Sequence, residues 1–227
     1  MRKILIITFM TLASLSAGAV TAADFFFPAD TTLVHYSPNA IFNGQIDSIV
    51  TKVAKPYDTA DLYKMTRRNL IGETVGDKIQ FTDSTVVIGA YYYRSNLDYN
   101  AGGRGRIFYD HEILRIPCAS DSASWTAYNS ISQNIYVSKF ERVSKFVTLR
   151  LTMNGAEQDV KALRVVSRQF TRNGESFPYG DRVEYWAERL GLILAYDSEG
   201  KLIEYASSLT DAPKSDPLAS PAEEASK

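Results

Sequence analysis

The sequence has few of the side chains that thiol and metal sites require. It contains one cysteine, Cys118, and two histidines, His35 and His111, among its 227 residues. A single cysteine cannot form an intrachain disulfide, and so few soft ligands do not favour a structural zinc site. We therefore expect neither a metal ion nor any other cofactor.

Long apolar runs are also scarce. One run, from Ile4 to about Leu15, follows two basic residues and leads through small residues to Val20-Thr21-Ala22. This order is typical of a cleaved export signal. No later apolar segment approaches the length of about 18 residues that a membrane-spanning helix needs. We predict a signal peptide over residues 1–22, cleavage near Ala22, and a periplasmic or secreted product without a transmembrane segment.

Neither sign of charge dominates. There are 25 Lys and Arg residues against 26 Asp and Glu residues, and removal of the leader with Arg2 and Lys3 lowers the formal charge from −1 to −3. This balance argues against nucleic acid as a partner and against attraction to anionic membrane surfaces. Cys118 lies far from the expected cleavage site, so we expect no lipid anchor at the new N-terminus.

Aromatic residues and strand-like alternation are abundant, with 14 Tyr, 11 Phe and 2 Trp in the chain. The clearest alternation covers Val147–Met153, where apolar residues alternate with Thr and Arg as in a sheet with one buried face. Asn154-Gly155 follows and predicts a hairpin that returns through residues 160–170. Residues 183–205 predict a second hairpin, with its turn at Asp197-Ser198-Glu199-Gly200.

Short runs at Leu62–Met65, Lys78–Phe81 and Thr85–Tyr93 are separated by turn residues, with no long amphipathic helix between them. This pattern predicts a mainly β domain built on an antiparallel sheet, with few or short helices. We expect one such domain over residues 23–209. The composition then changes to Asp, Ala, Pro, Lys, Ser and Glu, which predicts a disordered C-terminal tail over residues 210–227.

Three short motifs together resemble a family of proteins. The motifs are Phe27-Pro28 with Tyr36, Pro117 with Trp125, and Tyr185-Trp186-Ala187 leading to Gly191-Leu192-Ile193. In this order they resemble uncharacterised exported bacterial domains with a half-barrel similar to the lipoprotein localisation factor LolA. The resemblance implies a strongly curved antiparallel sheet with an apolar concave side, and it implies no activity or catalytic residues. Glu188-Arg189-Leu190 departs from the family pattern, which has small or apolar residues there.

Catalytic readings of the sequence find little support. A thiolate beside an imidazole can attack an acyl carbon. In an extended chain, however, a residue six positions beyond His111 already lies about 20 Å away, so His111 and Cys118 could meet only if the chain turned back. In Asp110-His111-Glu112 the histidine and the carboxylates would point to opposite faces of a strand, so the three cannot converge on a metal. We predict a protein that is not an enzyme. A hydrolase using Cys118 or paired carboxylates is kept as an alternative.

A curved sheet must cover its apolar face with other elements or with a ligand. Our candidates for the concave face and its rim are Trp186, Leu192, Leu194, Leu149, Leu151, Phe108 and Tyr92. We predict non-enzymatic binding of an apolar small molecule, a lipid or a lipid-bearing envelope protein on this face. The alternatives are an ordinary packed core at these positions and a scaffold protein that acts through a sheet edge or an aromatic patch.

Overall fold

The computed structural model describes residues 20–26, 32–42, 45–54, 63–68, 72–95, 107–118, 120–128, 137–171, 173–177 and 181–219. Within these ranges the chain forms one short helix and a series of antiparallel strands. The elements are α1 (Ala22–Phe26), β1 (Thr32–Phe42), β2 (Gln45–Ala54), β3 (Tyr63–Arg68), β4 (Gly72–Phe81), β5 (Thr85–Ser95), β6 (Ile107–Arg115), β7 (Ser122–Tyr128), β8 (Val137–Met153), β9 (Ala156–Thr171), β10 (Arg182–Ala187), β11 (Gly191–Tyr196) and β12 (Leu202–Ala206).

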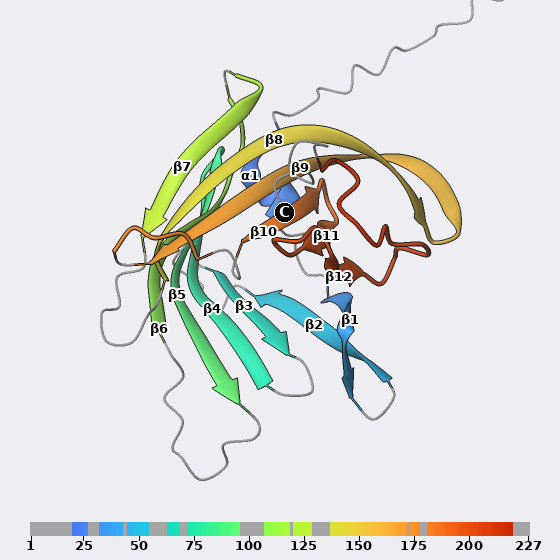
Figure 1. The fold of residues 1–227 in the computed structure, drawn as a ribbon, viewed down its shortest axis with the longest axis horizontal. Coiled ribbons are helices and arrows are strands. Elements are labelled where there is room, and N and C mark those ends of the chain that lie inside the picture. Colours follow the sequence, from blue (N-terminus) through green and yellow to red (C-terminus); the bar gives the residue numbers. More distant parts are fainter. Residues whose placement is uncertain are drawn as a thin grey trace, which may run out of the picture.

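The strands form one 12-stranded sheet in the order β6-β5-β4-β3-β2-β1-β12-β11-β10-β9-β8-β7. The strands at its two edges, β6 and β7, are consecutive in the chain and close in space, so the sheet curls until its edges approach each other (Figure 1). The prediction of a mainly β, strongly curved antiparallel sheet with few or short helices is confirmed. No helix in the described part of the chain is long and apolar enough to cross a membrane.

The hairpin predicted at Asn154-Gly155 joins the two longest strands, β8 and β9. Met153 pairs with Ala156, and the two turn residues between them have φ angles of 49° and 83°. Positive φ at both central positions is what a type I′ turn requires, and Asn and Gly adopt it most readily. The local sequence therefore determines the register of this pair.

Residues 183–205 differ from the prediction of one hairpin, because they contribute to three strands, β10, β11 and β12. The expected turn exists, and the Asp197 carboxylate accepts hydrogen bonds from Glu199 N and Lys201 N, each 2.9 Å long. A second turn lies between Ala187 and Gly191, where Arg189 adopts a φ of 62°. Residues 188–190 carry no turn signature, and a hydrogen bond from Arg189 N to Asp24 O of α1 holds this turn against the helix.

Side chains of β9 alternate between two hydrophobic clusters on opposite faces of the sheet. Leu163 and Val165 belong to the inner cluster, whereas Val160 and Ala162 belong to the outer cluster. The inner cluster includes α1, which contacts β5 and β6 as well as β10 and β11. These strand pairs are far apart in the sheet order, so α1 lies inside the curl, beneath the arch of β8 and β9 (Figure 1).

The C-terminal segment covers the outer cluster. Thr210 N donates to Thr152 O at 2.9 Å, Leu202 N donates to Lys214 O at 3.0 Å, and Asp216 is buried. Residues 210–219 are thus packed against the sheet, contrary to the disorder predicted from residue 210. Their polar composition predicted disorder, but the buried Arg164 pairs with Asp216 and offsets the cost of burying its charge. Residues 220–227 lie outside the described residues.

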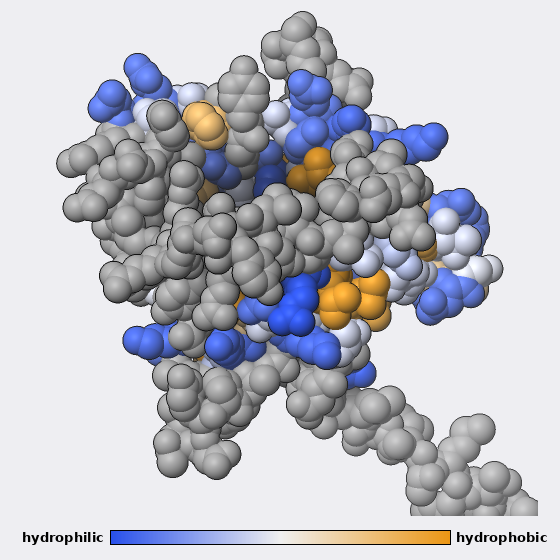
Figure 2. All heavy atoms as spheres, turned by 90° about the horizontal axis from the view of Figure 1, so that it is seen from below, coloured by the Kyte–Doolittle hydropathy of each residue, from blue (hydrophilic) through white to orange (hydrophobic). Residues whose placement is uncertain are grey.

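The described surface is mainly hydrophilic on the face shown in Figure 2, where hydrophobic residues form small separate patches. Among large apolar side chains of the described part, those exposed include Tyr128 at 63% and Val143 at 44%. Both lie near the β7 edge, on β7 and β8. Most large apolar side chains of the described part are therefore inside the curl or beneath the C-terminal segment.

Candidate functional site

The short helix α1 fills the apolar part of the interior. Phe25 and Phe26 are buried, and the Phe26 ring stacks on Trp186 with ring centroids 5.3 Å apart. The Phe25 ring lies 5.6 Å from that of Phe146 on β8. The inner apolar face thus has a cover that the sequence does not predict, because five residues are too few for a periodic helical pattern.

Few polar contacts hold α1 in place. The Asp24 carboxylate accepts hydrogen bonds from Thr21 N at 2.8 Å and Thr21 Oγ1 at 2.9 Å. Ala22 N donates to Asp83 O at 3.0 Å, and Arg189 N donates to Asp24 O at 2.6 Å. A five-residue helix is not stable alone, so these bonds and its two buried rings determine its position. Thr21 and Ala22 belong to the predicted leader, so of these contacts the Arg189 N to Asp24 O bond and the two buried rings are the ones that the mature protein keeps.

The predicted concave-face residues divide between the two faces of the sheet. Trp186 and Leu192 lie in the inner cluster, whereas Leu194 lies in the outer cluster. The cause is an irregularity in the pairing of β10 with β11: Trp186 pairs with Leu192, but the preceding Tyr185 pairs with Leu194. One residue is therefore inserted in β11, and the alternation changes face there.

For the remaining candidates, the position of each residue in its own strand determines which face its side chain occupies. Leu149 and Leu151 lie in the outer cluster, because Phe146 packs on the inner cluster and odd-numbered positions after it face the other way. Phe108 and Tyr92 belong to β6 and β5, but their side chains lie outside the described residues. The expectation of one apolar concave set is therefore wrong for Leu149, Leu151 and Leu194.

A group of polar residues on the inner face adjoins the apolar part, and we call it the interior polar cluster. It comprises His35, Thr51, Arg67, Arg182 and Glu204, from five different strands. Arg67 shares a face with Met65 of the inner cluster, two residues before it, and Thr51 lies opposite Arg67 in register. The interior of the curl therefore has an apolar part, formed by the inner cluster, beside a charged part, formed by the interior polar cluster.

Glu204 is the centre of this cluster. Its Oε1 atom lies 2.5 Å from Arg67 Nη2 and 3.6 Å from His35 Nδ1, and its Oε2 atom lies 3.8 Å from Arg182 Nη2. Burial opposes ionisation of this carboxyl, but the two guanidinium groups outweigh burial and hold its pKa below the ordinary value. Glu204 is therefore a buried carboxylate with cationic neighbours.

His35 is buried and neutral at pH 7. Burial lowers the pKa of its imidazole, and the attraction of Glu204 does not compensate. Its Nε2 atom lies 2.7 Å from Leu192 O, and since a carbonyl oxygen can only accept, Nε2 carries the proton. The Nδ1 atom is then an acceptor directed toward another acceptor, Glu204 Oε1.

Three buried polar atoms of the cluster have no hydrogen-bond partner: His35 Nδ1, Thr51 Oγ1 and Arg182 Nε. Buried polar atoms without partners are rare and costly, and often mark a place for water or a ligand. From the sequence, His35 is a candidate only as a metal ligand, and no local pattern predicts this cluster. Its members are distributed along residues 35–204, and only the strand order brings them together.

A cavity of about 580 Å³ has Arg182 among its lining residues, together with Val183 of the outer face and Asp216 of the C-terminal segment. It lies between β9, β10, the β11–β12 turn and the C-terminal segment, and Ser167, Arg182, Glu199 and Asp216 are among its lining residues. Its volume falls in the range typical of small-molecule sites, roughly 300–1,000 Å³. Burial raises the pKa of Asp181, another lining residue, despite a hydrogen bond from Gln169 N.

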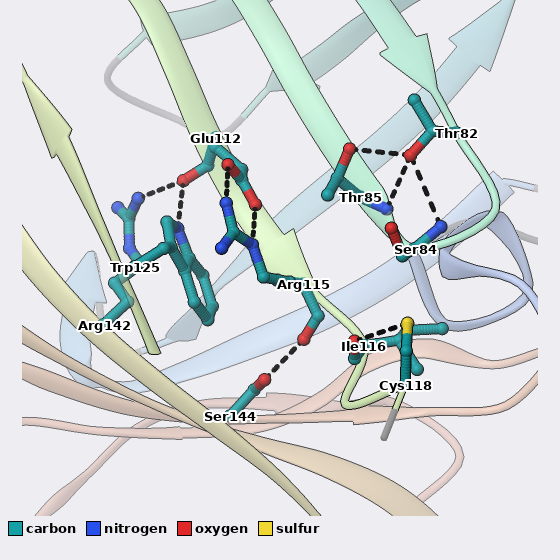
Figure 3. Close-up of polar contacts among 10 residues, drawn as sticks. All are labelled: Thr82, Ser84, Thr85, Glu112, Arg115, Ile116, Cys118, Trp125, Arg142 and Ser144. Atoms are coloured by element: carbon teal, nitrogen blue, oxygen red, sulfur yellow. Dashed lines mark hydrogen bonds and ion pairs between the residues drawn. The ribbon is translucent and has the colours of Figure 1, made fainter. Parts of the chain in front are cut away.

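Side chains of β7 and β8 close the gap between the sheet edges (Figure 3). Trp125 Nε1 donates to Glu112 O at 3.0 Å, and Arg142 Nη1 donates to the same oxygen at 2.6 Å. Ser144 Oγ donates to Arg115 O nearby. These bonds occupy backbone acceptors of β6 that a docking strand would otherwise use.

The described residues lend no support to the hydrolase alternative or to a metal site. Cys118 is exposed, and its thiol donates to Ile116 O at 3.4 Å (Figure 3). The His111 side chain lies outside the described residues, while the Glu112 carboxylate pairs with Arg115 at 2.6 and 2.8 Å. No group of three or more potential ligands that could hold a metal ion occurs in the described part of the chain.

No family model matches the sequence, and no curated protein matches it. Among solved structures, the chain is similar to an exported protein with a YmcC-like fold from Bacteroides fragilis. The two are 12% identical, the match covers 81% of this chain and 96% of the other, and the TM-score is 0.31. A TM-score of 0.31 is too low to establish a shared fold. The LolA-like half-barrel therefore stays a prediction.

Proposed function

We propose that this is an exported, non-enzymatic protein of the bacterial envelope that binds an amphiphile inside its curved sheet. The observation that carries the proposal is the division of the inner face. One part is apolar and covered by a five-residue helix, and the adjoining part is the interior polar cluster with three unpartnered atoms. An amphiphile has the same division between tail and head group.

The apolar part offers a site for a tail. Phe25 and Phe26 fill the space beside Trp186 and Leu192, and α1 is too short to be stable without the sheet. An acyl chain that displaced α1 would bury comparable apolar area against the same residues, so the two states could be close in free energy. We therefore regard α1 as the cover of the tail site in the unliganded protein.

Export rests on the leader sequence. The basic start, the apolar run from Ile4 to about Leu15 and the small residues before Ala23 support it. The alternative is a scaffold that acts through a sheet edge or an aromatic patch. Pairing through the β6 edge has less support, because Glu112 O and Arg115 O already accept hydrogen bonds there. A hydrolase using Cys118 or paired carboxylates stays an untested alternative.

The test is to express the precursor with its own leader in a bacterial host and purify the protein from the periplasmic fraction. Native mass spectrometry and organic extraction should then reveal a bound amphiphile at about one per chain. A Phe26→Ala variant should take up a fluorescent fatty-acid probe at least several-fold more strongly than wild type, because it weakens the cover. Tyr128→Ala, at an exposed position, is the matched control.

Two results would contradict the proposal. One is cytoplasmic retention of the unprocessed precursor, which would contradict the proposal that the protein is exported. The other is a purified protein without bound amphiphile that takes up no probe in either the wild type or Phe26→Ala, which would remove binding. In that case α1 is a permanent part of the core.

A further inference from the structure

The interior polar cluster contains a pair of acceptors without a proton between them. His35 Nδ1 and Glu204 Oε1 lie 3.6 Å apart, beyond hydrogen-bond distance. Nδ1 has no partner, and Nε2 carries the only proton of the neutral ring because it faces Leu192 O. Such an arrangement is unfavourable unless a donor group enters beside the two atoms.

We infer that the interior polar cluster binds an uncharged hydroxylated group, a vicinal diol of the kind found in sugars and glycerol. This inference rests on the proposed function, because the diol would be the head group of the amphiphile held by the inner face. It names the head-group chemistry that the proposed function leaves open.

The balance of charge indicates that the group is uncharged. Arg67 and Arg182 supply two positive charges, and Glu204 with Glu184, which lies 3.2 Å from Arg182, supplies two negative charges. An ammonium group would meet two guanidinium groups, and a carboxylate or phosphate would meet Glu204 and the acceptor atom of His35. A neutral group avoids both costs.

The number of unpartnered atoms indicates a diol. His35 Nδ1 has no partner, and Glu204 Oε1, which accepts a hydrogen bond from Arg67 Nη2, can accept a second one. One hydroxyl has a single proton to donate, so it cannot satisfy both atoms. Two adjacent hydroxyls can donate to both, while their oxygen atoms can accept from Arg182 Nε, which has no partner in this structure. Thr51 Oγ1, also unpartnered, can donate or accept in the same network.

The cluster is reachable from outside. The side chains of Arg67 and Arg182 are 23% and 35% exposed, whereas those of His35 and Glu204 are 3% and 7% exposed. A head group can thus approach past the two arginines and meet the unpartnered atoms behind them.

The experiment compares probes that share an eight-carbon chain and differ in head group. Octyl glucoside, octanoate and octylammonium, each below its micelle concentration, are titrated calorimetrically into the mature protein, and glucose alone is the fourth probe. We expect octyl glucoside to bind at least tenfold more tightly than either charged probe. Glucose alone should bind weakly, because it lacks the tail.

Two variants connect the preference to the cluster. Thr51→Val keeps the side-chain shape and removes an unpartnered hydroxyl, so it should not lower the Tm, yet it should weaken octyl glucoside several-fold. His35→Gln removes the Nδ1 acceptor and should weaken it further. Glu157→Gln, in an exposed ion pair with Arg150, is the matched control and should change nothing.

The outcomes separate this inference from the proposed function. Equal affinities for the three octyl probes, or a preference for octyl glucoside that survives both variants, would overturn the diol site and leave amphiphile binding intact. Binding of glucose as tight as octyl glucoside would support the diol site and overturn the tail site. If no octyl probe binds, both proposals fail, and ordered water occupies the cluster.

Discussion

Phe26 lies against Trp186 with ring centroids 5.3 Å apart and an angle of 25° between the ring planes. This stack joins the N-terminal helix to β10, from the opposite end of the chain. It explains why the inner face contains no open apolar surface around Trp186, although the sheet alone would leave one. Substitution of Phe26 therefore tests how strongly α1 covers the proposed tail site.

Phe26→Ala should lower the free energy of unfolding by about 3–5 kcal/mol, because it leaves a cavity among buried rings. Urea denaturation followed by tryptophan fluorescence measures the change. Tyr128→Ala, at a 63% exposed position, should change stability by no more than about 0.5 kcal/mol. A small effect of Phe26→Ala would show that α1 is not packed on Trp186 in solution.

Trp125→Phe should loosen the junction of the sheet edges while retaining an aromatic ring there. The loss of the Trp125 Nε1 to Glu112 O bond should cost about 0.5–1.5 kcal/mol. Amide hydrogen exchange should accelerate in β6 and β7 and stay unchanged in the β8–β9 hairpin. Uniform acceleration across the sheet would mean that the junction does not open locally.

Asp216→Ala should be strongly destabilising. Asp216 lies 2.8 Å from Arg164 Nη2 and accepts a hydrogen bond from the Tyr185 hydroxyl, and all three residues are buried. Removing the carboxylate leaves a buried guanidinium without its counter-charge, at a cost of about 3–5 kcal/mol.

The control for this prediction is Asp159→Asn, which breaks the exposed ion pair with Arg150 and should cost less than about 1 kcal/mol. Thermal denaturation compares the two variants. Equal, small shifts in Tm would show that residues 210–219 do not pack on the outer cluster in solution.

Glu204 should make stability depend on acid pH. Its pKa is lower in the folded protein than the ordinary value of 4.5, so the unfolded chain binds its proton first as pH falls. The stabilisation is complete above pH 4.5 and is lost as pH falls through the folded pKa. Urea unfolding from about pH 7 to about pH 3 should show this loss in wild type and a smaller one in Glu204→Gln. An equal loss of stability with falling pH in wild type and Glu204→Gln would contradict this prediction.

His35 should make stability depend on pH in a higher range than Glu204 does. The pKa of its imidazole is also lower in the folded protein than the ordinary value of 6.5. Its contribution to stability is therefore complete above pH 6.5 and is lost as pH falls below that value. Direct titration of the imidazole by NMR in wild type, with His35→Gln to identify its signal, measures the pKa. A value above 6.5 would mean that His35 is protonated and pairs with Glu204.

Local sequence determined much of the architecture. The alternation over Val147–Met153 and the Asn154-Gly155 turn predicted the β8–β9 hairpin, because turn chemistry and side-chain alternation act over a few residues. Short strands without long helices likewise predicted a curved antiparallel sheet. None of these inferences required knowledge of which strands become neighbours.

Tertiary structure alone decided which side chains meet. The inserted residue between Leu192 and Leu194 sends the two leucines to opposite faces, although their spacing predicts one face. The interior polar cluster draws residues from five strands, because β1 pairs with β12 and joins the two ends of the chain. Alternation determines on which side of its own strand a residue lies, while pairing across the sheet determines what lies beside it, and that depends on contacts distant in sequence.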